Sequence, residues 1–338
     1  MRWLWLLLKT LAGLVVLIVL LPFAWSLYLS TRPPAKTVRP LGTVPIARPF
    51  RIGRPFIDYM TLDGDRLYAA FASHSLVGVV DTTTNRNTAT IDGLPRVHGV
   101  ALVPELGLAF TSNGDDNMVG VVDLAHSRLL KEIPGGIDPD AILYDEKEHL
   151  IYVADHDGKT GTLLDPVAQK VVATIALGGE PEFCQSDAAS GLIYQNLEDT
   201  NELVVIDPQQ RAVIRRYKLG PGEGPTGLAF DSAHRRLFSA TRNKHLIVLS
   251  ADTGEIIADL PIGSAVDGVA YDPGLRRIYT ANALGTITVI QQDTADRYRV
   301  LEDAPSHLGG HSVVVNPSTH RIYIAYFGSL AVYEPILR

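Results

Sequence analysis

Ionisable side chains recur at one position of a repeating pattern in this chain. An aromatic residue marks each repeat, and the position twelve residues earlier begins a short apolar stretch. In chain order that position holds Phe56, His98, Asp140, Glu182, Thr226, Asp267 and His311. Imidazole nitrogens and carboxylate oxygens together suit zinc, manganese or iron better than copper(I). If the repeats surround one axis, five of these side chains converge as possible ligands of a divalent metal: His98, Asp140, Glu182, Asp267 and His311.

This predicted ring has three open interpretations. A bound cation would polarise a carbonyl group or lower the pKa of a water molecule. A ligand-binding mouth without a metal would use the same side chains, with Thr226, as charged and hydrogen-bonding partners. Alternatively, polar residues at strand starts only cap turns and contact water. The residues that end the aromatic strands are expected at the same face and are further candidates for ligand binding: Asn113, Asp155, Thr241 and Asn282.

The repeat itself predicts the elements that position these side chains. Its aromatic residues lie 42, 42, 42, 44, 41 and 44 positions apart: Tyr68, Phe110, Tyr152, Tyr194, Phe238, Tyr279 and Tyr323. One short apolar strand precedes each aromatic strand and two more follow, with Gly, Pro and Asp in the turns. Four alternating strands per repeat are typical of a propeller blade. We expect the aromatic residues to lie in the core and the Asp residues after the third strands to form turns.

The two ends of the repeat region predict how the propeller closes. The last repeat has three strands, whereas residues 46–52 have the character of a fourth strand with no preceding three. Pairing between them would leave no open sheet edge. We therefore predict an all-β, seven-bladed β-propeller over residues 46–338, with four-stranded blades and an N-terminal strand that closes the last blade.

The N-terminus carries a predicted membrane segment. Residues 11–29 have no charged side chain, and the run is long enough to cross a bilayer as a helix. Basic residues before the run favour a cytoplasmic N-terminus. Residues 1–30 are interpreted as a signal anchor in the inner membrane, or as a signal peptide that is cleaved near Ser26 and releases the protein. In both cases the body is periplasmic or otherwise extracytoplasmic. The Pro-rich residues 31–45 are expected to form a stiff linker.

Charge and cysteine content exclude several classes of function. Residues 51–338 hold 24 basic and 37 acidic side chains. Such an acidic body repels phosphate backbones, so we do not expect nucleic acid as a partner. The single cysteine, Cys184, excludes a disulfide framework and a CxxCH haem attachment, and it is expected to be a core thiol. The glycine-rich residues 220–225 precede no predicted helix, so a nucleotide-binding P-loop is also excluded.

The repeats resemble the YVTN-type β-propeller repeats of the YncE-like family. The sequences IYVAD at Tyr152, IYTAN at Tyr279 and IYIAY at Tyr323 are close to the Tyr-Val-Thr-Asn core of that family. The resemblance covers essentially the whole predicted propeller, but it departs at Tyr194, where the sequence is IYQN. It implies an exported seven-bladed propeller, often without established catalysis.

These observations favour one function and leave two alternatives. We expect a membrane-tethered, monomeric propeller that binds a small molecule or a partner protein at its polar channel mouth, with no catalysis assigned. The first alternative is a metal-dependent lyase or lactonase with its site at the same mouth. The second is an assembly scaffold that uses the outer surfaces of its blades.

Overall fold

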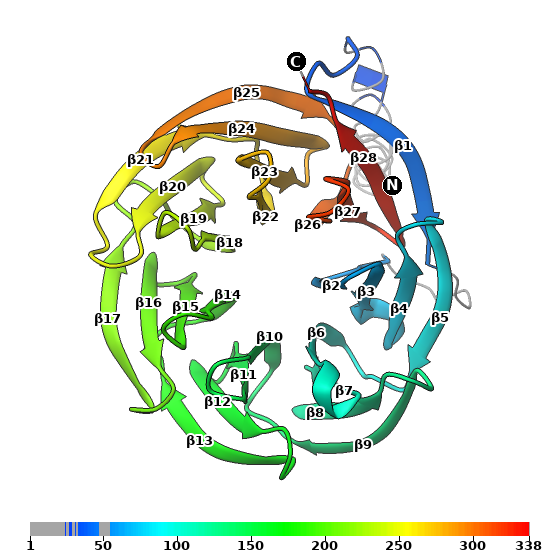
Figure 1. The fold of residues 1–338 in the computed structure, drawn as a ribbon, viewed down its shortest axis with the longest axis vertical. Helices are drawn as coiled ribbons and strands as arrows, with labels where there is room; N and C mark the ends of the chain where they lie inside the picture. Colours follow the sequence, from blue (N-terminus) through cyan, green and yellow to red (C-terminus); the bar gives the residue numbers. More distant parts are fainter. Residues whose placement is uncertain (1–23, 25–26, 29–30, 32, 47–54, 338) are drawn as a thin grey trace, which may run out of the picture.

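The computed structural model describes residues 24, 27–28, 31, 33–46 and 55–337. These residues form seven four-stranded antiparallel sheets, arranged as blades around a central channel (Figure 1). In the first six blades the chain runs from the innermost strand to the outermost. The fold is therefore the all-β, seven-bladed propeller that the repeat predicts.

The strands follow the repeat in order. Blade 1 contains β2 (Met60–Asp63), β3 (Arg66–Phe71), β4 (Leu76–Asp81) and β5 (Arg86–Asp92), and blade 2 contains β6 (Val97–Val103), β7 (Leu108–Asn113), β8 (Met118–Asp123) and β9 (Arg128–Pro134). Blade 3 contains β10 (Pro139–Asp145), β11 (Leu150–Asp155), β12 (Thr160–Asp165) and β13 (Lys170–Ala176), and blade 4 contains β14 (Pro181–Asp187), β15 (Leu192–Leu197), β16 (Glu202–Asp207) and β17 (Ala212–Lys218).

The second half of the propeller is built in the same way. Blade 5 contains β18 (Pro225–Asp231), β19 (Arg236–Thr241), β20 (His245–Ser250) and β21 (Ile256–Pro261), and blade 6 contains β22 (Val266–Asp272), β23 (Arg277–Asn282), β24 (Thr286–Thr294) and β25 (Arg297–Pro305). Blade 7 contains β26 (Gly310–Val315), β27 (Ile322–Tyr326), β28 (Ser329–Pro335) and β1 (Val38–Pro45). There are two short 3₁₀ turns among the described residues. In blade 1, η1 (Ala72–His74) joins β3 to β4, and in blade 2, η2 (Pro104–Leu106) joins β6 to β7.

The core lies between neighbouring blades. The second strand of each blade carries the repeat aromatic, and these seven side chains are at most 3% exposed, as predicted. Both faces of this strand are covered, which explains its nearly continuous apolar sequence. The Asp residues that end the third strands form turns: Asp81 Oδ1, for example, accepts hydrogen bonds from the backbone N–H groups of Thr83 and Thr84 at 2.8 and 2.9 Å.

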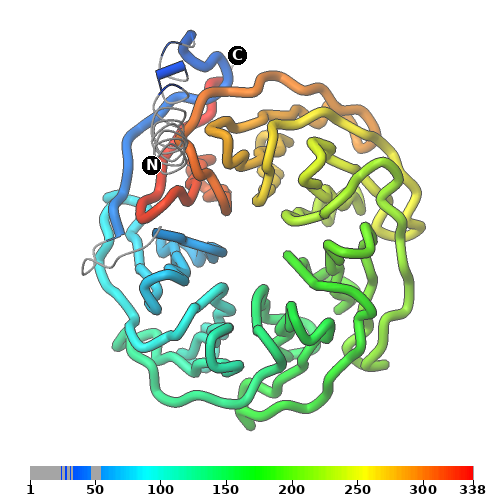
Figure 2. The backbone as a smooth tube through the Cα atoms, turned by 180° about the vertical axis from the view of Figure 1, so that it is seen from behind, coloured from blue at the N-terminus to red at the C-terminus, as the bar shows by residue number. Residues whose placement is uncertain are grey.

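The closing strand is β1, which lies before the position predicted from the sequence. It pairs antiparallel with β28 from Val38↔Pro335 to Pro45↔Ser329, so an N-terminal strand does close the last blade (Figure 2). However, β1 lies inside the stretch predicted as a linker, and of the predicted residues 46–52 only Ile46 is described. The two prolines of β1 argue against a strand in the sequence, but an edge strand with one partner tolerates proline. A register shift between Pro40 and Gly42 also interrupts its alternation.

The predicted membrane segment, residues 11–29, lies almost entirely outside the described residues. Within the part of the chain that the structure describes, no helix is long and apolar enough to cross a membrane.

Candidate ligand-binding site at the channel mouth

The predicted ring of polar residues is present at one end of the channel. In blades 2 to 7 the predicted residue is the second residue of the innermost strand: His98, Asp140, Glu182, Thr226, Asp267 and His311. Because the inner strands all start at the same face, these residues surround the channel mouth. The outer strands of each blade lie farther from the axis (Figure 1).

In blade 1 the ring position belongs to Asp58 and not to Phe56. The hairpin between β2 and β3 pairs Asp63 with Arg66, whereas the hairpin of blade 2 pairs Val103 with Leu108 and is two residues longer. Counting twelve residues back from Tyr68 therefore overshoots by two. Aligning the inner strands themselves would have identified Asp58 from the sequence. Phe56 lies beside the ring, with its aromatic ring edge-on to His311 and the ring centroids 4.4 Å apart.

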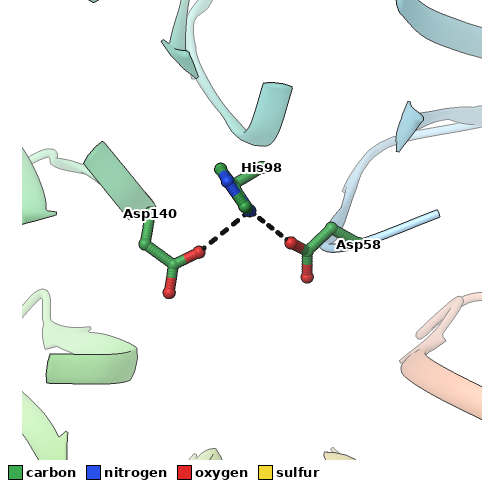
Figure 3. A group of neighbouring side chains, drawn as sticks. All are labelled: Asp58, His98 and Asp140. Atoms are coloured by element: carbon green, nitrogen blue, oxygen red, sulfur yellow. Dashed lines mark hydrogen bonds and ion pairs between the residues drawn. The ribbon is translucent and has the colours of Figure 1, made fainter. Parts of the chain in front are cut away.

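Asp58, His98 and Asp140 form a compact buried group, in which the side chains of three neighbouring blades point toward one another (Figure 3). His98 Nδ1 lies 2.5 Å from Asp58 Oδ2 and 3.2 Å from Asp140 Oδ1. The three residues are 5%, 6% and 8% exposed, in chain order. The other oxygen of Asp140, Oδ2, accepts a hydrogen bond from the Tyr59 hydroxyl at 3.2 Å.

His311 and Asp267 extend this group toward blade 6. His311 Nε2 contacts Asp267 Oδ2, and His311 Nδ1 lies 3.8 Å from Asp58 Oδ1. Burial opposes ionisation of Asp267, but His311 outweighs burial and lowers the pKa of Asp267. Burial alone would lower the pKa of His311, and Asp267 raises it instead. A continuous series of polar contacts thus runs through blades 6, 7, 1, 2 and 3.

Glu182 occupies the other side of the mouth and has weaker partners. Its Oε1 lies 3.8 Å from His156 Nε2 and 3.7 Å from an Arg242 guanidinium nitrogen, and that guanidinium also pairs with Glu198. Thr226, the next ring residue, contributes no charge. Its hydroxyl is directed to the backbone oxygens of Ala240 and Val266, at 3.5 and 3.3 Å.

Burial shifts the protonation of the ring. Burial alone would lower the pKa of His98, but the hydrogen bond to Asp58 and the charge of Asp140 raise it to about 9. Burial raises the pKa of Asp140 to about 6, although His98 opposes this shift. Burial, and then the charges of Asp140 and Asp267, raise the pKa of Glu182 well above its usual value. Burial is thus the main cause that opposes ionisation of Asp140 and Glu182.

Two aromatic rings cross the channel beneath the polar ring. Tyr59 follows Asp58 and Phe183 follows Glu182, and their ring centroids are 5.0 Å apart. All five other blades have a small residue at this position. The inner strands approach closely there: a Cβ on Gly227 would lie 2.7 Å from the backbone nitrogen of Val269. Beyond the two rings, a cavity of about 550 Å³ is lined by all seven inner strands. The aromatic pair thus separates the charged mouth from a wider funnel that both polar and apolar residues line.

The candidates at the ends of the aromatic strands lie inside their blades and not at the mouth. Asn113 donates to Glu132 on the outermost strand of blade 2 at 3.2 Å, and Asn282 donates to Thr286 and Thr288 in blade 6. Asp155 accepts hydrogen bonds from Thr160 and Thr162 in blade 3, and Thr241 donates to Asn243 and to the His245 carbonyl. Cys184 is 5% exposed in the core, and burial raises the pKa of its thiol. The polar side chains of this group therefore make these contacts within their own blades.

No protein-family model matches this chain, and no curated protein matches it. Among solved structures it is similar to Kuenenia stuttgartiensis hydrazine synthase, with a TM-score of 0.70 and 17% identity over 89% of this chain and 97% of that chain. It is also similar to the structure of U3-55K, with a TM-score of 0.71, 11% identity and coverage of 90% and 100%. The crystal structure of RRP9 WD40 repeats gives a TM-score of 0.72, 10% identity and coverage of 90% and 99%. At these identities the similarity shows the β-propeller fold alone.

Proposed function

We propose that this protein is an exported, membrane-tethered propeller of the YncE-like type that binds a positively charged ligand at the channel mouth. The observation that carries this proposal is the excess of carboxylates in the ring. Asp58, Asp140, Glu182 and Asp267 face two ring imidazoles, His98 and His311. Burial raises the pKa of Glu182, and the charges of Asp140 and Asp267 raise it further. A cation at the mouth would relieve repulsion among partly buried carboxylates. Residues 11–29 support the tether, and the repeat motifs support the family.

Binding is tested with two cations of different chemistry, Mn²⁺ and spermidine, added to the full chain after treatment with EDTA. A ligand at 100 times its Kd stabilises the folded state by about 2.7 kcal/mol. For a propeller of this size we expect the melting temperature to rise by about 5 °C with at least one probe. Isothermal titration calorimetry then gives the affinity.

Asp140→Asn is the test variant, because it removes one ring charge with little change in shape. Its affinity for the effective probe should fall at least tenfold. Glu146→Gln is the matched control: Glu146 is exposed and lines the funnel beyond the aromatic pair. We expect Glu146→Gln to bind the probe as tightly as the wild-type chain. The proposal is wrong if neither probe binds the wild-type chain, or if Asp140→Asn binds the effective probe as tightly as Glu146→Gln does.

A further inference from the structure

We infer that Asp58, His98 and Asp140 form a three-ligand site for a divalent transition metal, with Mn²⁺, Fe²⁺ and Zn²⁺ as the fitting ions. This inference rests on the proposed function and names the class of cation that the mouth binds. The ligand atoms are Asp58 Oδ2, His98 Nδ1 and Asp140 Oδ1. One imidazole and two carboxylates form a donor set that these borderline and hard cations accept.

The ligand atoms already converge on a common point. All three lie within 4.8 Å of one another, and Nδ1 is 2.5 and 3.2 Å from the two oxygens. Ligands that bind one metal at about 2.0–2.2 Å lie about 3 Å apart. The side chains therefore need only small shifts to coordinate an ion. They come from the starts of three adjacent blades, so the fold fixes their spacing (Figure 3).

Outer contacts orient both carboxylates. Tyr59 donates its hydroxyl to Asp140 Oδ2, the oxygen that does not face His98. On the other side, His311 lies 3.8 Å from Asp58 Oδ1 and is itself paired with Asp267. One oxygen of Asp140 thus accepts a hydrogen bond from an outer residue, and one oxygen of Asp58 faces His311 without a hydrogen bond. The remaining oxygen of each carboxylate is directed at Nδ1. Such outer partners are characteristic of metal sites, where they hold the ligands in place.

The other ring nitrogen of His98, Nε2, is not a ligand atom of the proposed site. His98 is 6% exposed, and its Nε2 has no hydrogen-bond partner among the described residues. With a metal on Nδ1, the neutral ring carries its proton on Nε2, so the observation that favours the metal is the convergence of the three buried ligand atoms.

Two other groups near the mouth have ligand atoms within 4.8 Å, and they serve as internal controls. Both include His156, one with Asp138 and Asp157 and the other with Glu182 and Glu198. They are less buried, and Arg242 already pairs with both Glu182 and Glu198. His156→Gln removes a ligand from both groups and leaves the proposed site intact.

The experiment is a calorimetric titration of the EDTA-treated full chain, purified in detergent, with Mn²⁺ and separately with Zn²⁺. We expect one ion per chain for at least one metal. Asp58→Asn and His98→Gln should each weaken binding at least 100-fold, whereas His156→Gln should change it less than threefold. Tyr59→Phe removes only the outer hydrogen bond and should weaken binding about tenfold. Far-UV circular dichroism checks each fold, and Asp140→Asn replaces any ligand variant that does not fold.

The possible outcomes distinguish a failure of this inference from a failure of the proposed function. If a metal binds but only His156→Gln impairs binding, the metal lies elsewhere at the mouth, so the inference is wrong and the proposed function stands. If neither metal binds the wild-type chain but spermidine does, the ligand is an organic cation and the inference again fails alone. If no probe binds, both fail.

Discussion

Asp155 is a buried carboxyl group inside blade 3, with 0% of its surface exposed. Thr160 and Thr162 donate to its Oδ2 at 2.8 and 2.7 Å, but its Oδ1 has no hydrogen-bond partner among the described residues. Burial raises the pKa of Asp155 to about 6, although the two threonines oppose the shift. In the unfolded chain the pKa would be about 3.9. Folding therefore favours the protonated form, and the carboxyl group destabilises the blade as the pH rises through about 6.

Asp155→Asn is predicted to stabilise the protein at neutral pH. Asn282 occupies the same strand-end position in blade 6 and donates to the equivalent threonines. A pKa difference of about two corresponds to about 1–3 kcal/mol at pH 7.5, and the gain should shrink toward zero near pH 4. Urea denaturation at both values of pH measures it. The exposed neighbour Asp157→Asn is the control, and an equal effect of Asp155→Asn at both pH values would contradict the assignment.

At the scale of the element, β1 joins the two ends of the chain and removes the open edge of the last blade (Figure 2). Val38 and Val44 are each 1% exposed, although all five residues between them are exposed. Beside the strand, Glu302 on β25 accepts hydrogen bonds from Lys36 and Thr37. The strand therefore contributes both backbone pairing and core contacts across blades 6 and 7.

Deletion of residues 1–46 is predicted to lower the melting temperature by at least 10 °C or to cause aggregation, because it exposes the edge of β28. Deletion of residues 1–33 keeps β1 and its contact with Glu302, so it should leave the melting temperature within about 2 °C of the wild-type value. Differential scanning fluorimetry compares the two truncated chains. Equal melting temperatures would mean that β1 does not hold the propeller closed.

The sequence predicted repeated elements well and single exceptions poorly. Seven equivalent aromatic residues predict seven blades because each blade buries the same strand against its neighbour. The shorter hairpin of blade 1 shifted the alignment by two residues, so Asp58 was not predicted as a ring residue. The prolines of β1 led to the prediction of a linker, although an edge strand with only one partner tolerates proline. The position of Asn113 and Asn282 in the repeat also did not predict which way their side chains point. Their side chains extend across their blades, because only the innermost strands face the axis.

At the scale of the whole molecule, the proposed export would place the mouth outside the cytoplasm. A reporter enzyme that is active only outside the cytoplasm, fused after Arg338, is predicted to be active with the wild-type chain. Replacing Leu17 and Leu20 by arginine should abolish this activity, because charges at the centre of the run oppose insertion. Carbonate extraction then distinguishes an anchored chain from a cleaved one. A cytoplasmic, full-length product from the wild-type gene would contradict export.

The measurement that tests the central claim most directly is the position of a cation in the folded protein. Crystals grown with Mn²⁺ would be measured near the manganese absorption edge, and an anomalous difference map locates the ion without assumptions about its ligands. We predict one strong peak at the channel mouth, within coordination distance of Asp58, His98 Nδ1 and Asp140. A map with no peak inside the ring of inner-strand carboxylates, at Mn²⁺ concentrations that saturate the calorimetric titration, would contradict this account.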